Sequence, residues 1–404
     1  MKPAKWVDLA GLAFLGACVP GGDSNGTGSA STAFTERDSA GIVIAVTLGS
    51  QARAALGWEV DTVPDLEIGV TGESSGDESA EPWQQFHRIG GVRQLSDGRV
   101  VVVDGGSSEV RFFDSRGQFL HRFGGSGQGP GEFGGSPVLV PAFQRDSLLI
   151  FDSRPVRFHF LSTDADGYRL VRPATWSGAV PPVGFIDPNV LAQIGNLQKP
   201  TTTGAYEIPL TYAWIHIVTG DRTLVDSFTV RRQYTVKFVN NIAFGGLIPF
   251  SSMPSAAVTR IGALVTEGAL PEIKEYDLEG RLQRIIRIDE PRRNITNTDI
   301  QRYVEVTGKP TDPDIPIPEM MPTFESLLVD DEGWLWAKVY EYDPEQRPAW
   351  VVFDPSGRAH GSIRTPVGLR VQQIAGDFMF GVWTDELGVE HVRKHRVDRR
   401  SRER

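Results

Sequence analysis

Short apolar runs alternate with turn sequences between residues 98 and 133. The runs are β-branched or aromatic, and they occupy Val100–Val103, Val110–Phe113 and Phe119–Phe123. Each run ends at a turn rich in glycine, aspartate or both, such as Asp104-Gly105-Gly106. This pattern is typical of antiparallel strands joined by tight turns. With the run that precedes Asp97-Gly98, the stretch predicts one four-stranded antiparallel sheet.

Similar groups of short strands recur at intervals of roughly 40–50 residues, a spacing typical of blade repeats. Six groups predict an all-β fold, a six-bladed β-propeller of four-stranded antiparallel blades over residues 36–398. The last group is one strand short, and Trp58–Gly69 offers a spare strand. We expect this strand to pair with residues 390–397 and close the ring, because an open ring leaves unpaired strand edges. The run Ile42–Val46 is expected either to extend that same blade or to pack beneath the ring.

One segment interrupts the strand pattern, and it predicts a small helix-and-loop insertion at residues 296–322. Apolar residues at Ile300, Tyr303 and Val304 have helical spacing, with Thr298 as the expected N-cap and Gly308 as the stop. Five prolines follow between residues 310 and 322. We expect the insertion to lie over one face of the ring.

The N-terminus has the sequence features of an exported lipoprotein in their usual order: a signal peptide, a lipobox and a tether. Residues 1–17 combine two early lysines with a short apolar run, which predicts a signal peptide. Leu15-Gly16-Ala17-Cys18 resembles a bacterial lipobox, so Cys18 is the expected lipidation site. Residues 18–35 have the Gly/Ser-rich composition of a flexible tether. The alternative is an ordinary secretory signal cut after Ala17.

Charge limits the partners that this chain can bind. The 404 residues carry a net charge of −10, which argues against nucleic acid, because binding phosphates along a strand needs a basic surface. Residues 399–404 form a basic C-terminal tail. The expected membrane contact is therefore the lipid anchor on Cys18, with the protein exported to the cell envelope.

The stretch from Asp97 to Phe133 resembles an NHL-type repeat in its Asp97-Gly98 turn, its two strands ending at Asp104 and Asp114, and Gly127–Phe133. From about residue 36 the chain resembles bacterial six-bladed β-propeller lipoproteins built from such repeats. The resemblance implies the propeller fold and leaves the activity open. Related propellers include protein-binding modules, metal-dependent lactonases and peptide-amidating lyases.

Acidic residues recur where second strands end, at Asp104, Asp152 and Glu267. If these carboxylates face one mouth of a central channel, they could hold Ca²⁺, which prefers several oxygen ligands, or a cationic ligand. The alternative is that they are turn residues, since aspartate favours turns.

Other motifs favour structural roles. The glycine-rich segment 124–135 lacks the helix of a phosphate loop and predicts a crossover between blades, with Phe133 inserted between them. His391 and His395 lie four apart in a basic segment, which predicts one face of a solvated edge strand. Strand-spaced tryptophans such as Trp336 predict packing between blades.

Two functions remain open from the sequence. The first is a membrane-tethered envelope scaffold that presents a propeller face to a peptide, protein or glycan. The second is a metal-dependent hydrolase or lyase, of Ca²⁺ type, acting at the channel mouth. The sequence has no catalytic set that decides for an enzyme, so we favour the scaffold.

Replacing Cys18 with serine tests the lipoprotein hypothesis. Cys18→Ser removes the thiol that would carry the lipid, so we expect the chain to leave the membrane fraction of a bacterial host. Fractionation followed by immunoblotting measures this. A variant that stays with the membrane to the same extent as the unmodified chain would contradict the hypothesis.

Overall fold

The computed structural model describes residues 33–70, 81–162, 168–172, 176, 180–195, 202–239, 242–309 and 315–399. Cys18, the expected signal peptide 1–17, nearly all of the tether and residues 400–404 lie outside these ranges. By compactness the chain divides into Met1–Thr32 and Ala33–Arg404, and every described residue belongs to the second unit. Along the described ranges, no helix has both the length and the apolar character that a membrane crossing requires.

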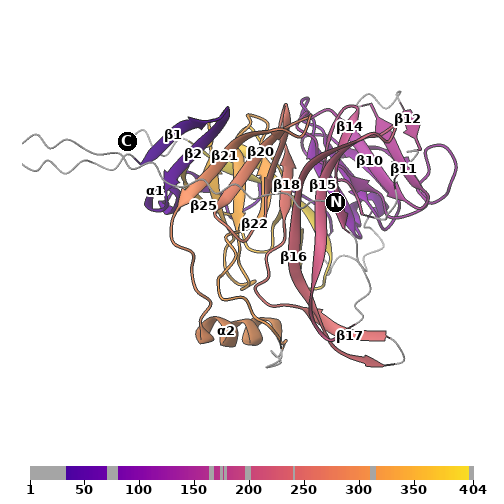
Figure 1. The fold of residues 1–404 in the computed structure, drawn as a ribbon. Coiled ribbons are helices and arrows are strands. Elements are labelled where there is room, and N and C mark those ends of the chain that lie inside the picture. The colour runs from indigo at the N-terminus through magenta and orange to yellow at the C-terminus, as the bar shows by residue number, and fades with distance from the viewer. Residues whose placement is uncertain are drawn as a thin grey trace, which may run out of the picture. The chain divides into compact units, whose positions relative to one another are not determined.

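The described strands form six sheets, which we number in chain order (Figure 1). The first sheet contains β5 (Ile89–Gln94), β6 (Val100–Asp104), β7 (Glu109–Phe113) and β8 (Phe119–Gly124). The second contains β9 (Val138–Leu139), β10 (Leu148–Ser153), β11 (Val156–Leu161) and β12 (Tyr168–Val171). The third contains β13 (Gly184–Ile186), β14 (Asn189–Gly195), β15 (Gly204–His216), β16 (Arg222–Val239) and β17 (Ile242–Leu247).

The remaining three sheets follow the same antiparallel order. The fourth contains β18 (Ser255–Val258), β19 (Gly262–Thr266), β20 (Glu272–Asp277) and β21 (Leu282–Asp289). The fifth contains β22 (Phe324–Val329), β23 (Leu335–Val339), β24 (Ala349–Phe353) and β25 (Ala359–Arg364). The sixth contains β26 (Arg370–Ala375), β27 (Phe378–Thr384) and β28 (Glu390–Asp398). The expected all-β fold is confirmed, and the first, second and fifth sheets have the expected four antiparallel strands.

The burial of these strands explains why they could be predicted from the sequence. All five residues of β6 and of β19 are buried, so both of their faces are covered and their sequences are nearly continuous apolar runs. In β8, by contrast, half-buried and exposed positions alternate, as expected for a strand with one covered face.

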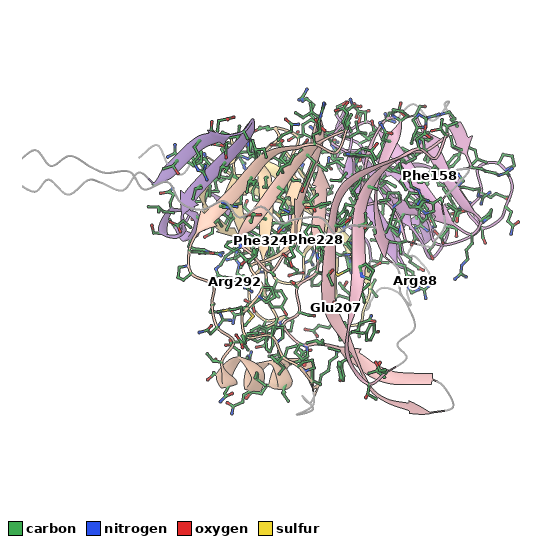
Figure 2. All side chains as sticks on the ribbon, viewed as in Figure 1. Arg88, Phe158, Glu207, Phe228, Arg292 and Phe324 are labelled. Atoms are coloured by element: carbon green, nitrogen blue, oxygen red, sulfur yellow. The ribbon has the colours of Figure 1, made fainter. Side chains whose placement is uncertain are left out.

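Five apolar clusters lie between consecutive sheets. Each cluster takes buried side chains from two sheets that are neighbours in chain order, and Figure 2 shows Phe158 and Phe324 among the sheets that they join. A further cluster joins the sixth sheet to the first, where Phe380 and Val392 pack with Phe113. Every sheet therefore shares a core with the sheet before it and the sheet after it.

A belt formed by residues 34–68 runs past three of these sheets. Its strands β1 (Phe34–Ser39) and β2 (Ile42–Leu48) extend the fourth sheet, because β2 pairs in parallel with β21. After the short helix α1 (Gly49–Arg53), the Leu56 N–H donates to the Ser362 carbonyl of the fifth sheet at 2.9 Å. The run Ile42–Val46 thus extends the fourth sheet, so the expectation that it extends the last blade or packs beneath the ring is wrong.

The belt ends in the sixth sheet. Strands β3 (Glu59–Val60) and β4 (Leu66–Ile68) both pair with β28, as expected for residues 58–69. A short 3₁₀ helix, η1 (Pro82–Gln84), then precedes the first sheet. Because β28 has a partner on each side, it is not an edge strand, and His391 and His395 are fully buried. The expectation of a solvated edge strand at these histidines is wrong.

The third sheet and the insertion differ from the sequence-based expectation in detail. Strands β15 and β16 span 13 and 18 residues, and β17, which the sequence did not indicate, extends them on the side where α2 lies (Figure 1). Helix α2 (Asn297–Thr307) begins two residues earlier than expected. Its N-cap is Thr296, not Thr298, because Thr296 and Asp299 form a reciprocal capping box. Gly308 ends the helix in a left-handed conformation, as expected.

A buried hydroxyl in the belt provides a test of its contribution to stability. The Thr47 Oγ1 accepts a hydrogen bond of 3.0 Å from the Ala359 N–H of the fifth sheet, and Thr47 is fully buried. Thr47→Val keeps the shape and removes this acceptor, so we expect the free energy of unfolding to fall by about 1–3 kcal/mol. Urea denaturation measures it. The control is Thr35→Val at an exposed position in β1, with an expected change within about 0.5 kcal/mol. Equal stability of both variants would mean that this contact contributes nothing.

Candidate functional site

The expected site residue Asp104 is buried at the end of β6, and side chains and backbone of this chain surround its carboxylate. Its Oδ1 accepts from the His87 N–H at 3.0 Å, and its Oδ2 accepts from the Ser107 hydroxyl at 2.7 Å. The Arg111 Nη2 lies 3.1 Å from the same Oδ2, and both charged side chains are buried. The carboxylate therefore has internal donors at both oxygens.

Asp152 has the same surroundings in the second sheet. Its oxygens accept from the Gly134 and Gly135 N–H groups, each at 2.9 Å, and from the Arg157 Nη2 at 2.7 Å. Burial alone would raise the pKa of Asp152, but the hydrogen bonds from Arg157 and the backbone hold it below its ordinary value. This carboxylate is a charged internal partner of Arg157 at neutral pH.

These two pairs, which we call the crossover clamps, hold equivalent loops. In each clamp the arginine also donates to two carbonyls of the loop that enters its sheet: from Arg111 to Trp83 and Gln85, and from Arg157 to Gln128 and Glu132. A buried phenylalanine follows each loop, Phe86 or Phe133, and the next N–H donates to the clamp carboxylate. Phe133 packs between the first and second sheets, as the sequence predicted. The clamps thus fix the crossovers between sheets.

Glu267, the third expected site residue, has surroundings different from those of Asp104 and Asp152. The residue that ends β19 is Thr266, which is buried and donates from its hydroxyl to the Glu272 carbonyl at 2.8 Å. Glu267 comes one position later and lines a cavity of about 210 Å³ together with Arg292. Within the described ranges, no group of three or more His, Cys, Asp or Glu side chains is placed to hold a metal ion. Asp104 and Asp152 are each paired with an internal arginine, and a cation site formed by the three carboxylates stays a prediction.

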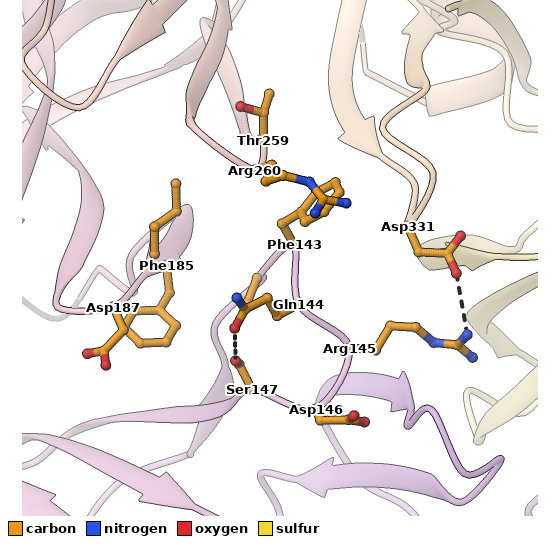
Figure 3. Close-up of a pocket in the computed structure, with 12 residues that line it drawn as sticks. Phe143, Gln144, Arg145, Asp146, Ser147, Phe185, Asp187, Thr259, Arg260 and Asp331 are labelled. Carbon is orange, nitrogen blue, oxygen red and sulfur yellow. Dashed lines mark hydrogen bonds and ion pairs between the residues drawn. The ribbon is translucent and has the colours of Figure 1, made fainter. Parts of the chain in front are cut away.

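A larger cavity, of about 600 Å³, lies at the opposite ends of the second strands (Figure 3). It is lined by the turns that join the first and second strands of four sheets. The second sheet contributes residues 142–147, and the third, fourth and fifth contribute Asp187, Arg260 and Asp331 among others. These turns carry no distinctive sequence pattern, because charged residues are common in turns of many kinds.

Polar contacts fix one wall of this cavity. The Arg145 guanidinium lies 3.3 Å from the Asp331 carboxylate and donates to the Gln94 side chain at 3.1 Å (Figure 3). The Asp331 carboxylate also accepts from the Gly376 N–H at 3.0 Å. Since Gln94 belongs to the first sheet and Gly376 to the sixth, Arg145 and Asp331 connect this wall to both neighbouring sheets.

Arg260 and Asp187 are the two charged side chains at this cavity that have neither an ion pair nor a hydrogen bond among the described residues. The exposed Arg260 guanidinium lies over the Phe143 ring, 5.0 Å from the centroid. Among the described residues, no carboxylate lies within ion-pair distance of Arg260. The cavity therefore combines a cation, an aromatic surface and a fixed polar wall, which suits a ligand with a carboxylate and an apolar group.

Comparisons with known proteins bear on the fold. No family model matches the chain, and no curated protein matches it. A solved structure of a DUF4221 family member from Bacteroides vulgatus is similar at 10% identity and a TM-score of 0.48, covering 84% of this chain and 98% of that one. A protein described as exported, from Bacteroides fragilis, is similar at 12% identity and a TM-score of 0.44, covering 86% and 97%.

An enzyme is also among the similar structures. Virginiamycin B lyase from Staphylococcus aureus has 11% identity and a TM-score of 0.35, with coverage of 84% of this chain and 99% of that one. All three similarities are distant, with identities of 12% or less and TM-scores below 0.5. The chain has an all-β, β-propeller-like fold.

A histidine beside the second crossover clamp is expected to make stability depend on pH: His159 is buried, with its Nε2 4.0 Å from the Asp152 carboxylate. Burial, with the nearby Arg157 charge, lowers the pKa of His159 to about 4, whereas the unfolded value is near 6.5. Between these values only the unfolded chain binds the proton, so the free energy of unfolding falls as the pH drops from 6.5 to 4. We expect His159→Gln to remove up to about 1.4 kcal/mol of this loss per pH unit.

Urea denaturation at pH 7.5, 6.5, 5.5 and 4.5 gives the slope of the free energy of unfolding against pH. This slope is compared between the unmodified chain and His159→Gln. His87→Gln, at an exposed position, controls for the substitution itself. If the His159→Gln slope matches that of the unmodified chain, His159 is not the group responsible.

Proposed function

We propose that this chain is a closed, six-bladed β-propeller that is exported, anchored through a lipid on Cys18, and binds a peptide or protein ligand. The six sheets and the apolar clusters between consecutive sheets support six blades. The pairing of β4 with β28 supports a ring completed by an N-terminal strand. The signal sequence and lipobox support export and anchoring.

The ligand site is the cavity at the turns between first and second strands. The observation that carries this proposal is Arg260, a cation without a carboxylate partner among the described residues, held over Phe143 at the rim of a cavity of about 600 Å³. Arginine binds carboxylates through paired hydrogen bonds, and an aromatic surface binds an adjacent apolar group. The ligand is therefore a peptide segment with an acidic group next to an apolar side chain.

The walls of this cavity are ordered before a ligand arrives. Arg145 is held by Asp331 and Gln94, and Asp146 accepts from the Ser96 N–H at 2.8 Å and from its hydroxyl at 2.6 Å. Side chains that are already fixed lose little conformational freedom on binding. This arrangement suits a binding module with a defined specificity.

Peptide and glycan arrays test the proposal, using the full chain with Cys18→Ser so that the lipid does not contribute. We expect enrichment of acidic peptides, and about tenfold or greater weakening of a selected peptide by Arg260→Gln or by Phe143→Ala. Arg116→Gln, an exposed arginine in the first sheet, is the matched control. Binding that survives both substitutions would place the ligand elsewhere, and selection of glycans alone would overturn the peptide assignment.

A further inference from the structure

A second cavity lies where the belt crosses the fifth sheet, apart from the proposed ligand site. Its volume is about 710 Å³, and it is lined by belt residues 53–62, by Arg347 and by residues 362–364 at the end of β25. None of these residues lines the cavity of Arg260. Its walls come from two segments about 300 residues apart in sequence.

Two arginines at this cavity hold one another in place. The Arg347 Nη2 donates to the Arg364 carbonyl at 3.2 Å, and the Arg364 Nη1 donates to the Arg347 carbonyl at 2.9 Å. The Arg347 Nε also donates to the Thr365 carbonyl at 3.4 Å. These contacts occupy some donors of each guanidinium and leave others for a ligand, since a guanidinium has five N–H groups.

The positive charges of this arginine pair lack internal compensation. Among the described residues, no carboxylate lies within 4.0 Å of the side-chain nitrogens of Arg347 or Arg364. Arg53, which also lines the cavity, differs because the Glu290 carboxylate binds it, with Nε to Oε2 at 3.0 Å. Glu59 and Asp61 line the belt side of the cavity without an ion pair to either arginine.

We propose that the Arg347–Arg364 pair binds a phosphate-type oxyanion, either free phosphate or the phosphate of a lipid headgroup. Two guanidinium groups on one wall repel each other, and a doubly charged oxyanion would offset that repulsion. Phosphate oxygens also match the planar arrangement of guanidinium donors better than chloride does. Such a site is unexpected in a chain whose net charge is −10, because that charge disfavours anions in general.

An anion at this position would also strengthen the belt. The Ser362 N–H donates to the Ala54 carbonyl at 2.7 Å, so the arginine wall is directly attached to the belt. A ligand that binds only the folded chain stabilises it, by an amount that grows with the logarithm of the ligand concentration once this exceeds the dissociation constant. Phosphate binding should therefore raise the melting temperature of the whole unit.

Inorganic phosphate is the first probe, with the full chain carrying Cys18→Ser. Calorimetry and thermal melting are run in phosphate and in chloride at equal ionic strength. We expect phosphate to raise the melting temperature, and Arg347→Gln/Arg364→Gln to weaken phosphate binding about tenfold or more. Arg116→Gln is the matched control and should bind as the unmodified chain does. Arg347→Lys/Arg364→Lys keeps both charges without the paired donors, so it should bind phosphate less tightly than the unmodified chain.

Vesicles of phosphatidylcholine with and without phosphatidylglycerol are the second probe and separate the two sources. Phosphate binding without vesicle binding assigns a free oxyanion. Vesicle binding that needs phosphatidylglycerol and is lost in Arg347→Gln/Arg364→Gln assigns a headgroup. Equal phosphate affinity in the unmodified chain and in the folded double variant, or no binding of either probe, overturns the proposal. The peptide experiment at Arg260 is unaffected by any of these outcomes.

Discussion

Pairing between the belt and strands from the far end of the chain is the constraint on which the rest of this structure depends. The fourth sheet would present β21 as an open edge, and β2 covers it by parallel pairing. The sixth sheet has three strands of its own, and β3 and β4 supply the next position beside β28. Between these points Leu56 bonds to the fifth sheet. The belt thus completes the sixth sheet, covers the edge of the fourth sheet and is hydrogen-bonded to the fifth.

The second strands of the first two sheets differ sharply between their two ends. At one end, Asp104 and Asp152 are buried against arginines that also hold the incoming crossover loops. At the other end, the turn of the second sheet meets turns of the third, fourth and fifth sheets around a cavity with an available cation. Removing one partner of a buried ion pair leaves an uncompensated charge, so the clamped ends resist change. The turn ends do not carry the crossovers and can vary in sequence, as binding surfaces on a rigid framework do.

Much of the fold could be predicted because the inner strands are buried on both faces and read as apolar runs. Phe133 could be placed because a lone aromatic residue after a glycine-rich loop has few other roles. The position of Ile42–Val46 could not be predicted, since the sequence of a short apolar strand does not determine which strand it pairs with. The prediction that His391 and His395 lie on a solvated edge strand was wrong for a related reason. Whether β28 is an edge depends on residues 59–68, about 330 positions away.

The candidate site was harder to predict than the fold. The pattern of Asp104 and Asp152 was real, but its meaning depends on Arg111 and Arg157 in the following strands. A repeated acid at a strand end fits an internal ion pair as well as a metal ligand. The Arg260 cavity arises only when turns from four sheets meet, so no single stretch of sequence contains it.

The pairing of β3 with β28 also constrains how the chain is made. Val60 pairs with Val397, so about 340 residues must be synthesised after Val60 before its partner exists. At roughly 5–20 residues per second, this takes on the order of 17–70 seconds. During that time residues 59–68 lack their strand partner and their backbone is hydrogen-bonded to water, while the first sheets can already fold. A factor that shields a nascent or translocating chain would therefore act on this segment longer than on any of the strands that pair with their immediate neighbours.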